Sequence, residues 1–223
     1  MRVIFMGTPD FAVGTLEDII KAGHEVVLVV SQPDKAVGRS KALKYTPVKE
    51  CAVAHGIEVY QPAKIRAEES VEYLRQYNAD IIIVEAFGQI IPKAILDMPR
   101  FGCVNVHASL LPKYRGAAPI QWAVLNGDQV TGVTTMRMDE GLDTGDMIMK
   151  QEVIVDEDET GGSLFDKLSG VGAKLCVKRG KQLKMVQLFT NLRMKRLQLP
   201  PERSRKRRDV STGPKMQRQS SVW

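Results

Sequence analysis

Residues 101–120 read Phe-Gly-Cys-Val-Asn-Val-His-Ala-Ser-Leu-Leu-Pro-Lys-Tyr-Arg-Gly-Ala-Ala-Pro-Ile. The segment opens as a β-branched run in which Asn105 and His107 stand two positions apart, so on a strand both side chains leave the same face, roughly 6.6 Å from each other. A loop with Pro112 follows, and a helical pattern resumes near Pro119. Open α/β sheets bind ligands at the carboxyl ends of their strands, which makes this pair a candidate site. Taken alone, the pair is better explained as polar groups whose hydrogen bonds are satisfied inside the core.

Strands and helices alternate on both sides of this segment. The apolar run from Glu25 to Ser31 is typical of a strand buried on both faces, and with the strand and helix before it the run forms a βαβ unit of about 30 residues. We therefore expect an α/β fold with a Rossmann-like, doubly wound and mainly parallel sheet. The expected strands lie near 2–6, 25–31, 57–60, 80–84, 101–107, 131–138 and 147–155, and the expected helices near 10–22, 47–54, 67–77, 118–126 and 160–175.

The sequence after the strand at 101–107 resembles a known family. It reads His-Ala-Ser-Leu-Leu-Pro-Lys-Tyr-Arg-Gly from His107, and Gly-Leu-Asp-Thr-Gly-Asp follows from Gly141. These motifs, in this order, resemble the folate-dependent formyltransferases. The resemblance implies that Asn105, His107 and Asp143 are catalytic and that no metal takes part. It also implies that the tetrahydrofolate of a 10-formyltetrahydrofolate donor is held by Ser109, Leu110, Leu111 and Pro112.

Residues 84–92, Val-Glu-Ala-Phe-Gly-Gln-Ile-Ile-Pro, follow the strongest expected strand. By composition alone, the apolar side chains of this segment belong to ordinary core residues. The resemblance implies that this segment borders the pterin, with Phe87, Gly88 and Ile91 as contacts. Glu85 departs from the small or apolar residue that is usual there, and a carboxylate beside the folate pocket would be solvated or would weaken binding.

Residues 32–50 form a loop that is long for a compact domain, and such loops are usually functional or disordered. Five basic residues stand against two acidic ones in it, which fits attraction to phosphates and a solvated polar surface equally well. The opening string Gly-Thr-Pro-Asp-Phe-Ala from Gly7, and the Pro-Asp-Lys, Gly-Arg and Pro-Val-Lys of the loop, resemble the formyltransferase branch that acts on methionyl initiator tRNA. That resemblance implies tRNA contacts at Arg39, Lys41 and Lys44, with Arg39 foremost.

Composition limits the class of protein. Hydrophobic residues make up 43% of the chain, which suffices for a core, and no apolar run approaches the roughly 20 residues that span a bilayer. Cys51, Cys103 and Cys176 are unclustered, which indicates free thiols in a reducing compartment. The segment from Gly7 does not match Gly-x-Gly-x-x-Gly, so we predict no NAD site. We expect a cytoplasmic monomer that does not associate with membranes.

The net charge of +6 combines two oppositely charged parts. Residues 1–175 hold 18 Lys and Arg against 24 Asp and Glu, whereas residues 176–223 hold 14 against 2. We expect a formyltransferase catalytic domain at 1–175 and a basic tail at 176–223 that is not a folded domain. A basic block at 203–208 is typical of a nucleic-acid-binding or targeting tail. The resemblance implies a C-terminal β-barrel instead, and we favour a truncated or frameshifted end as the reason that its pattern is missing.

These patterns lead to a hypothesis about the reaction. The resemblance implies transfer of a formyl group from 10-formyltetrahydrofolate to methionyl initiator tRNA, a step of one-carbon chemistry that supports translation initiation. Asn105 and protonated His107 would stabilise a tetrahedral oxyanion, and Asp143 would favour the protonated imidazole and help to remove the proton of the amine. Three alternatives stay open: an inactive folate-binding remnant without the tRNA-binding domain, a formyltransferase for a small amine, and a nucleic-acid-binding protein based on the tail.

Overall fold

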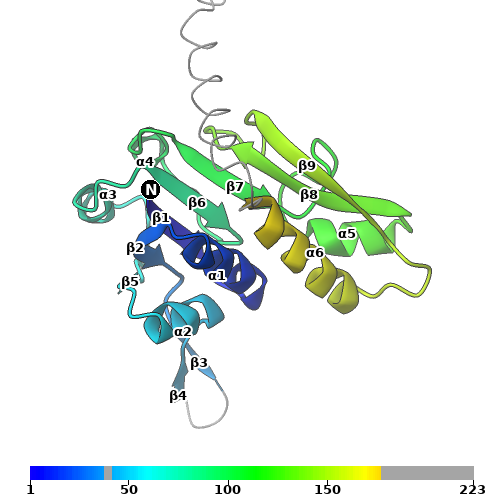
Figure 1. The fold of residues 1–223 in the computed structure, drawn as a ribbon, viewed down its shortest axis with the longest axis horizontal. Helices are drawn as coiled ribbons and strands as arrows, with labels where there is room; N and C mark the ends of the chain where they lie inside the picture. Colours follow the sequence, from blue (N-terminus) through cyan, green and yellow to red (C-terminus); the bar gives the residue numbers. More distant parts are fainter. Residues whose placement is uncertain (38–41, 177–223) are drawn as a thin grey trace, which may run out of the picture.

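The computed structural model describes residues 1–37 and 42–176 (Figure 1). Their strands form a seven-stranded sheet in the order β5-β2-β1-β6-β7-β8-β9 and a separate hairpin, β3-β4. The predicted tRNA contacts at Arg39 and Lys41 lie outside the described residues, as does the predicted basic tail after Cys176.

The strands from β5 to β7 in this order run parallel, which confirms the predicted α/β fold with a mainly parallel sheet. Val and Ile are the most frequent residues in these strands, because both faces of the strands are covered and have no contact with water. β8 and β9 run antiparallel, which the sequence did not reveal; the chain turns back directly between them, as an antiparallel pair allows. The strands are β1 (Arg2–Gly7), β2 (Glu25–Val30), β3 (Lys35–Val37), β4 (Ala42–Lys44), β5 (Val59–Tyr60), β6 (Ile81–Glu85), β7 (Cys103–His107), β8 (Val130–Arg137) and β9 (Met147–Ile154).

Helices cover both faces of the sheet (Figure 1). One face packs against α1, α2, α5 and α6, with α1 and α6 side by side, and the opposite face packs against α3 and α4. No helix in the described part of the chain is long and apolar enough to cross a membrane. A 3-10 turn, η1, stands where the sequence predicted the start of a longer first helix. These elements are η1 (Asp10–Ala12), α1 (Val13–Lys21), α2 (Pro47–Ala54), α3 (Glu68–Arg75), α4 (Lys93–Leu96), α5 (Pro119–Leu125) and α6 (Gly161–Cys176).

The predicted long loop at 32–50 contains the β3-β4 hairpin, in which Lys35 lies opposite Lys44. At the base of the hairpin the ammonium group of Lys49 forms an ion pair with Asp34. Their side chains are only 15% and 12% exposed, so this ion pair is largely shielded from water. The contact ties the two ends of the hairpin segment together beside the sheet edge.

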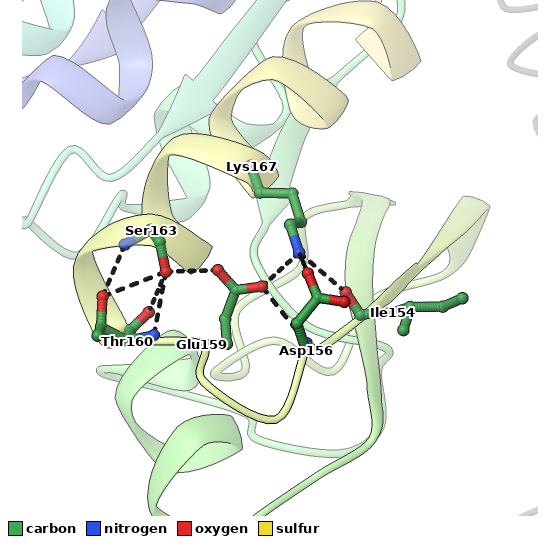
Figure 2. Close-up of polar contacts among 6 residues, drawn as sticks. All are labelled: Ile154, Asp156, Glu159, Thr160, Ser163 and Lys167. Carbon is green, nitrogen blue, oxygen red and sulfur yellow. Dashed lines mark hydrogen bonds and ion pairs between the residues drawn. The ribbon is translucent and has the colours of Figure 1, made fainter.

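The start of α6 is fixed by polar contacts in the turn before it (Figure 2). The Ser163 N–H donates to Thr160 Oγ1 at 3.1 Å, and the Thr160 N–H donates to Ser163 Oγ at 3.0 Å, a reciprocal pattern that satisfies donors at a helix start. Lys167, one turn later, binds the carboxylates of Asp156 and Glu159. Two of the four acidic residues in this turn, Asp156 and Glu159, are therefore paired with a side chain of the helix that the turn precedes.

β6 ends in a carboxylate that is completely buried, Glu85. Neither carboxylate oxygen makes a hydrogen bond with a described residue. Gly172 of α6 leaves the space for it, because a Cβ at that position would lie 3.1 Å from Glu85 Oε1. Burial raises the pKa of Glu85 to about 8. Glu85 is therefore a core residue, and the expectation that it is solvated is wrong.

We expect Glu85 to make protein stability depend on pH. Its pKa is higher in the folded protein than the ordinary value of 4.5, so the folded protein keeps a proton that the unfolded chain releases. Stability should therefore fall by on the order of 1 kcal/mol per pH unit as the pH rises from about 4.5 to about 8. Urea unfolding across this range measures the slope. Glu85→Gln should remove it, whereas Glu25→Gln, an exposed control, should keep it; a slope unchanged in Glu85→Gln would contradict the assignment.

Candidate active site

A cavity of about 490 Å³ opens at the carboxyl edge of the sheet. Its volume lies within the range of pockets that bind small ligands. The walls come from the segments that follow β1 and β6, from the end of β7, from α6, and from two loops that fold over this edge. They include Pro9, Phe11, Val84, Ala86–Ile90, Asn105–Ala108, Gly116–Gln121, Met138, Leu142, Asp143 and Phe165.

The three residues predicted to be catalytic meet at this cavity. Asn105 and His107 come from one face of β7, and Asp143 comes from the turn between β8 and β9. Asn105 Nδ2 donates to Asp143 Oδ1 at 3.3 Å, and His107 Nδ1 lies 3.6 Å from Asp143 Oδ2. The side chains of His107 and Asp143 are only 8% and 12% exposed. Charge interactions among them are therefore less screened than on an open surface.

The Asp143 carboxylate also holds a third segment of the chain. Its Oδ2 accepts the Gly116 N–H at 2.8 Å, which ties the turn after β8 to the loop after β7. Asp143 itself has a φ of 51°, a left-handed conformation that Asp adopts more readily than most residues. The backbone turn and the carboxylate contacts together set the position of this side chain.

The second ring nitrogen of His107 is held by the backbone. Nε2 lies 2.9 Å from the carbonyl oxygen of Tyr114. A carbonyl oxygen only accepts, so Nε2 carries the proton in this hydrogen bond. Nδ1 is therefore the nitrogen that faces Asp143 and remains available to a substrate.

The segment predicted to hold the folate directly follows Ala108, which lines the cavity. Ser109 and Leu111 are buried, and the Thr134 hydroxyl of β8 donates to the Ser109 carbonyl oxygen at 2.7 Å and accepts the Leu111 N–H at 3.1 Å. These contacts shape the loop that leads to the cavity. The described residues that line the cavity do not include the predicted set Ser109, Leu110, Leu111 and Pro112.

Only two of the three predicted pterin contacts line the cavity. Phe87 and Gly88 line the cavity. Ile91 does not line it: this side chain is 6% exposed and packs in the core beside α3 and α4. Ile90, which is 84% exposed, lines the cavity at the neighbouring position.

A second cavity, of about 550 Å³, adjoins the first and shares Pro9 and the segment 86–88 with it. Lys35, Lys44 and Tyr45 line it from the hairpin side. Neither lysine forms an ion pair with a described residue, and no described Asp or Glu lines this cavity. Like charges on directly opposite strand positions are unfavourable without a counter-ion, so this wall is suited to an anion.

The sequence profile of the formyl transferase family matches residues 1–179. The chain belongs to this family. A methionyl-tRNA formyltransferase from Agathobacter rectalis is 75% identical over 183 residues, which cover 82% of this chain and 59% of that protein. Another, from Lachnospira eligens, is 67% identical over 178 residues and covers 80% and 56%. The chain thus spans less than 60% of the length of these relatives.

Solved structures of formyl transferases share the fold. Phosphoribosylglycinamide formyltransferase from Bacillus halodurans matches with a TM-score of 0.63 and 25% identity, over 82% of this chain and 98% of that one. The enzyme of the same name from Anaplasma phagocytophilum matches with a TM-score of 0.68 and 21% identity, over 83% and 88%. The Rossmann-like architecture is therefore that of the family.

Several residues that line the cavity were missed by the sequence analysis. Met138 and Leu142 reach the cavity from the chain between β8 and β9, and Phe165 reaches it from α6. Apolar residues in such patterns are usually core residues, so periodicity does not separate them from the cavity wall. Only Leu142 had a usable signal, because it directly precedes Asp143.

We expect Thr134→Val to destabilise the fold by about 1–3 kcal/mol, because its hydroxyl satisfies two buried backbone groups of the loop. Thr135 offers a matched control on the same strand: it is equally buried, and its hydroxyl has no hydrogen-bond partner among the described residues. Thr135→Val should leave stability unchanged or raise it. Urea unfolding compares the two variants, and equal losses would contradict the role given to the Thr134 hydroxyl.

Proposed function

We propose that this chain transfers a formyl group from 10-formyltetrahydrofolate to the amino group of methionine on initiator tRNA. The proposal rests on the meeting of Asn105, His107 and Asp143 at one cavity, in a chain 75% identical over 183 residues to a methionyl-tRNA formyltransferase. The reaction takes place in the cytoplasm, where the charged initiator tRNA is used for translation.

The cavity is suited to the proposed donor. Phe87, Ile90 and Leu142 offer apolar walls for a flat ring, and the polar side chains of the site stand on the same cavity. We propose Phe87 and Gly88 as pterin contacts, with Ile90 in the place first given to Ile91. The segment from Ser109 to Pro112 follows Ala108 of this wall in the chain, and we propose it as a folate contact on the resemblance alone. When bound, 10-formyltetrahydrofolate supplies the formyl group.

The side chains of the site have the donors and acceptors that the transfer requires. Asn105 Nδ2 has a second N–H beside the one that binds Asp143, and this N–H donates to the formyl oxygen as negative charge develops. His107 donates to the same oxygen from Nδ1 when that nitrogen is protonated. A carbon–nitrogen bond forms between the formyl carbon and the amine while the bond to the donor nitrogen breaks. Asp143 accepts the proton that the amine loses, and the released donor nitrogen takes up a proton.

Single-turnover transfer to methionyl initiator tRNA tests the three assignments. We expect Asn105→Ala and His107→Ala each to slow transfer at least about 100-fold, the usual loss for an oxyanion donor. Asp143→Asn is preferable to an alanine variant, because asparagine also tolerates the positive φ and can accept the Gly116 N–H. It should slow transfer to a similar extent.

Circular dichroism and folate titration of each variant provide the control for folding. Near-normal turnover in a folded variant would remove that residue from the mechanism. Transfer by the unmodified chain to a small amine but not to tRNA would favour the small-acceptor alternative. Folate binding without any transfer would favour an inactive remnant.

The lysine-lined second cavity supports an RNA acceptor. Lys35 and Lys44 place two positive charges beside the cavity that holds the three proposed catalytic residues. Tyr45 is 47% exposed, and because Lys49 Nζ lies over one face of its ring, 3.9 Å from the centroid, only the other face can stack on a base. We propose Lys44 as a tRNA contact on this basis, and Arg39 and Lys41 on the resemblance of the loop alone.

We expect the double variant Lys35→Ala/Lys44→Ala to bind initiator tRNA more weakly and to lower the slope of log affinity against log salt by about 1 per lysine. Filter binding at several salt concentrations measures both quantities. The double variant Lys21→Ala/Lys174→Ala, in the last turns of α1 and α6 and away from the carboxyl edge of the sheet, is the charge-matched control. If the control weakens tRNA binding and lowers the salt slope as much as Lys35→Ala/Lys44→Ala does, only net charge matters for binding.

A further inference from the structure

Asp128 binds the side chains of two successive residues in the loop that follows β7. Both of its carboxylate oxygens lie 2.7 Å from Lys113 Nζ, and its Oδ2 accepts the Tyr114 hydroxyl at 2.9 Å. The Asn126 amide donates to the same Tyr114 hydroxyl at 2.8 Å. Because that N–H occupies the acceptor side of the hydroxyl, the hydroxyl proton is directed toward Asp128.

Tyr114 connects this cluster to the active site. Its φ of 57° is a left-handed conformation that a non-glycine residue keeps only when its surroundings determine it. Its carbonyl oxygen is the partner of His107 Nε2, at 2.9 Å. Asp128 thus holds the side chain of Tyr114, and the backbone carbonyl of Tyr114 holds the His107 ring.

We propose that Asp128 is a positioning residue for His107. It fixes the backbone of Tyr114 so that the carbonyl oxygen binds Nε2 and leaves Nδ1 toward Asp143 and the cavity. The catalytic consequence of this arrangement rests on the proposed formyl transfer, whereas the effect on the histidine ring does not.

The geometry around Asp128 differs from that of an ordinary surface ion pair. An exposed Lys–carboxylate pair contributes little to stability, and the Lys113 side chain is 55% exposed. The Asp128 side chain, however, is 12% exposed and has a second partner in the Tyr114 hydroxyl. The hydrogen bond from Lys113 keeps the pKa of Asp128 below its usual range, so both contacts involve the ionised carboxylate at neutral pH. The main effect of these contacts is to fix the orientation of the Tyr114 side chain rather than to add stability.

The test is the tautomer of His107 in the full chain, measured by nitrogen-15 NMR of the imidazole. The chain has two other histidines, His24 and His55, so His107→Gln assigns the signals. We expect the neutral ring of the unmodified protein to carry its proton on Nε2. In Asp128→Ala this preference should decrease toward the mixture of tautomers found in an unrestrained histidine side chain. An unchanged nitrogen signature in a folded Asp128→Ala protein would overturn the proposal, whatever its activity.

Two single-contact variants keep the test valid if Asp128→Ala fails to fold. Tyr114→Phe removes the hydroxyl contact and Lys113→Met removes the ammonium contact, and each should shift the tautomer balance in the same direction. Glu17→Gln, which breaks the Lys21 pair on α1, should leave the balance unchanged. If neither single-contact variant shifts the balance, Asp128 does not act through Tyr114 and the proposal fails.

Kinetics separate this proposal from the proposed function. If the chain transfers formyl groups, Asp128→Ala should lower kcat by about 10–100-fold with little change in KM, because misplacing a catalytic group affects the chemical step. A tautomer shift in a chain without any transfer activity would support the positioning role and contradict the proposed function. A loss of activity without a tautomer shift would contradict the positioning role alone.

Discussion

The site depends above all on one carboxylate and on where the fold places it. Asp143 contacts Asn105 and His107 on β7 through its two oxygens and accepts the Gly116 N–H from the loop after β7. These partners all precede Asp143 by at least 27 residues in the chain, so the carboxylate joins β7 and the loop after it to the turn between β8 and β9. Its side chain is largely buried, where an unpaired charge would be costly. The loops that satisfy it therefore also close the cavity around the two side chains of β7.

The period of a β-strand explains why a second buried carboxylate takes no part in this site. Val84 lines the cavity, whereas Glu85, the next residue of β6, points to the opposite face of the sheet, toward α6. Ile90 and Ile91 also differ, since Ile90 is exposed at the cavity and Ile91 is buried in the core. They lie in an irregular segment after β6, so strand alternation does not explain this difference. Two adjacent residues of the same type can thus lie one at a cavity and the other in the core.

Sequence reasoning worked where local pattern and strand order determine structure. The alternation of apolar strands with helices predicted the mainly parallel sheet, and the spacing of Asn105 and His107 placed both side chains on one face of a strand. It was less successful where the chain folds over the sheet edge. The hairpin within 32–50 and the antiparallel pairing of β9 with β8 join neighbouring segments, but no turn motif in the sequence marked them. The burial of Leu111 depends on Thr134, 23 residues further along the chain, which no local pattern encodes.

The sequence by itself determined the fold class, the family resemblance and the identity of the three polar residues that meet at the cavity, because short motifs and strand periodicity are local properties. Only the tertiary structure decided which nitrogen of His107 faces the cavity. That choice follows from the Tyr114 carbonyl oxygen, whose position depends on a left-handed backbone conformation and on the partners of a side chain across the loop. Hydrogen-bond directions of this kind depend on how the loop folds back on β7 and on Asp128, so they become defined only when the chain is folded.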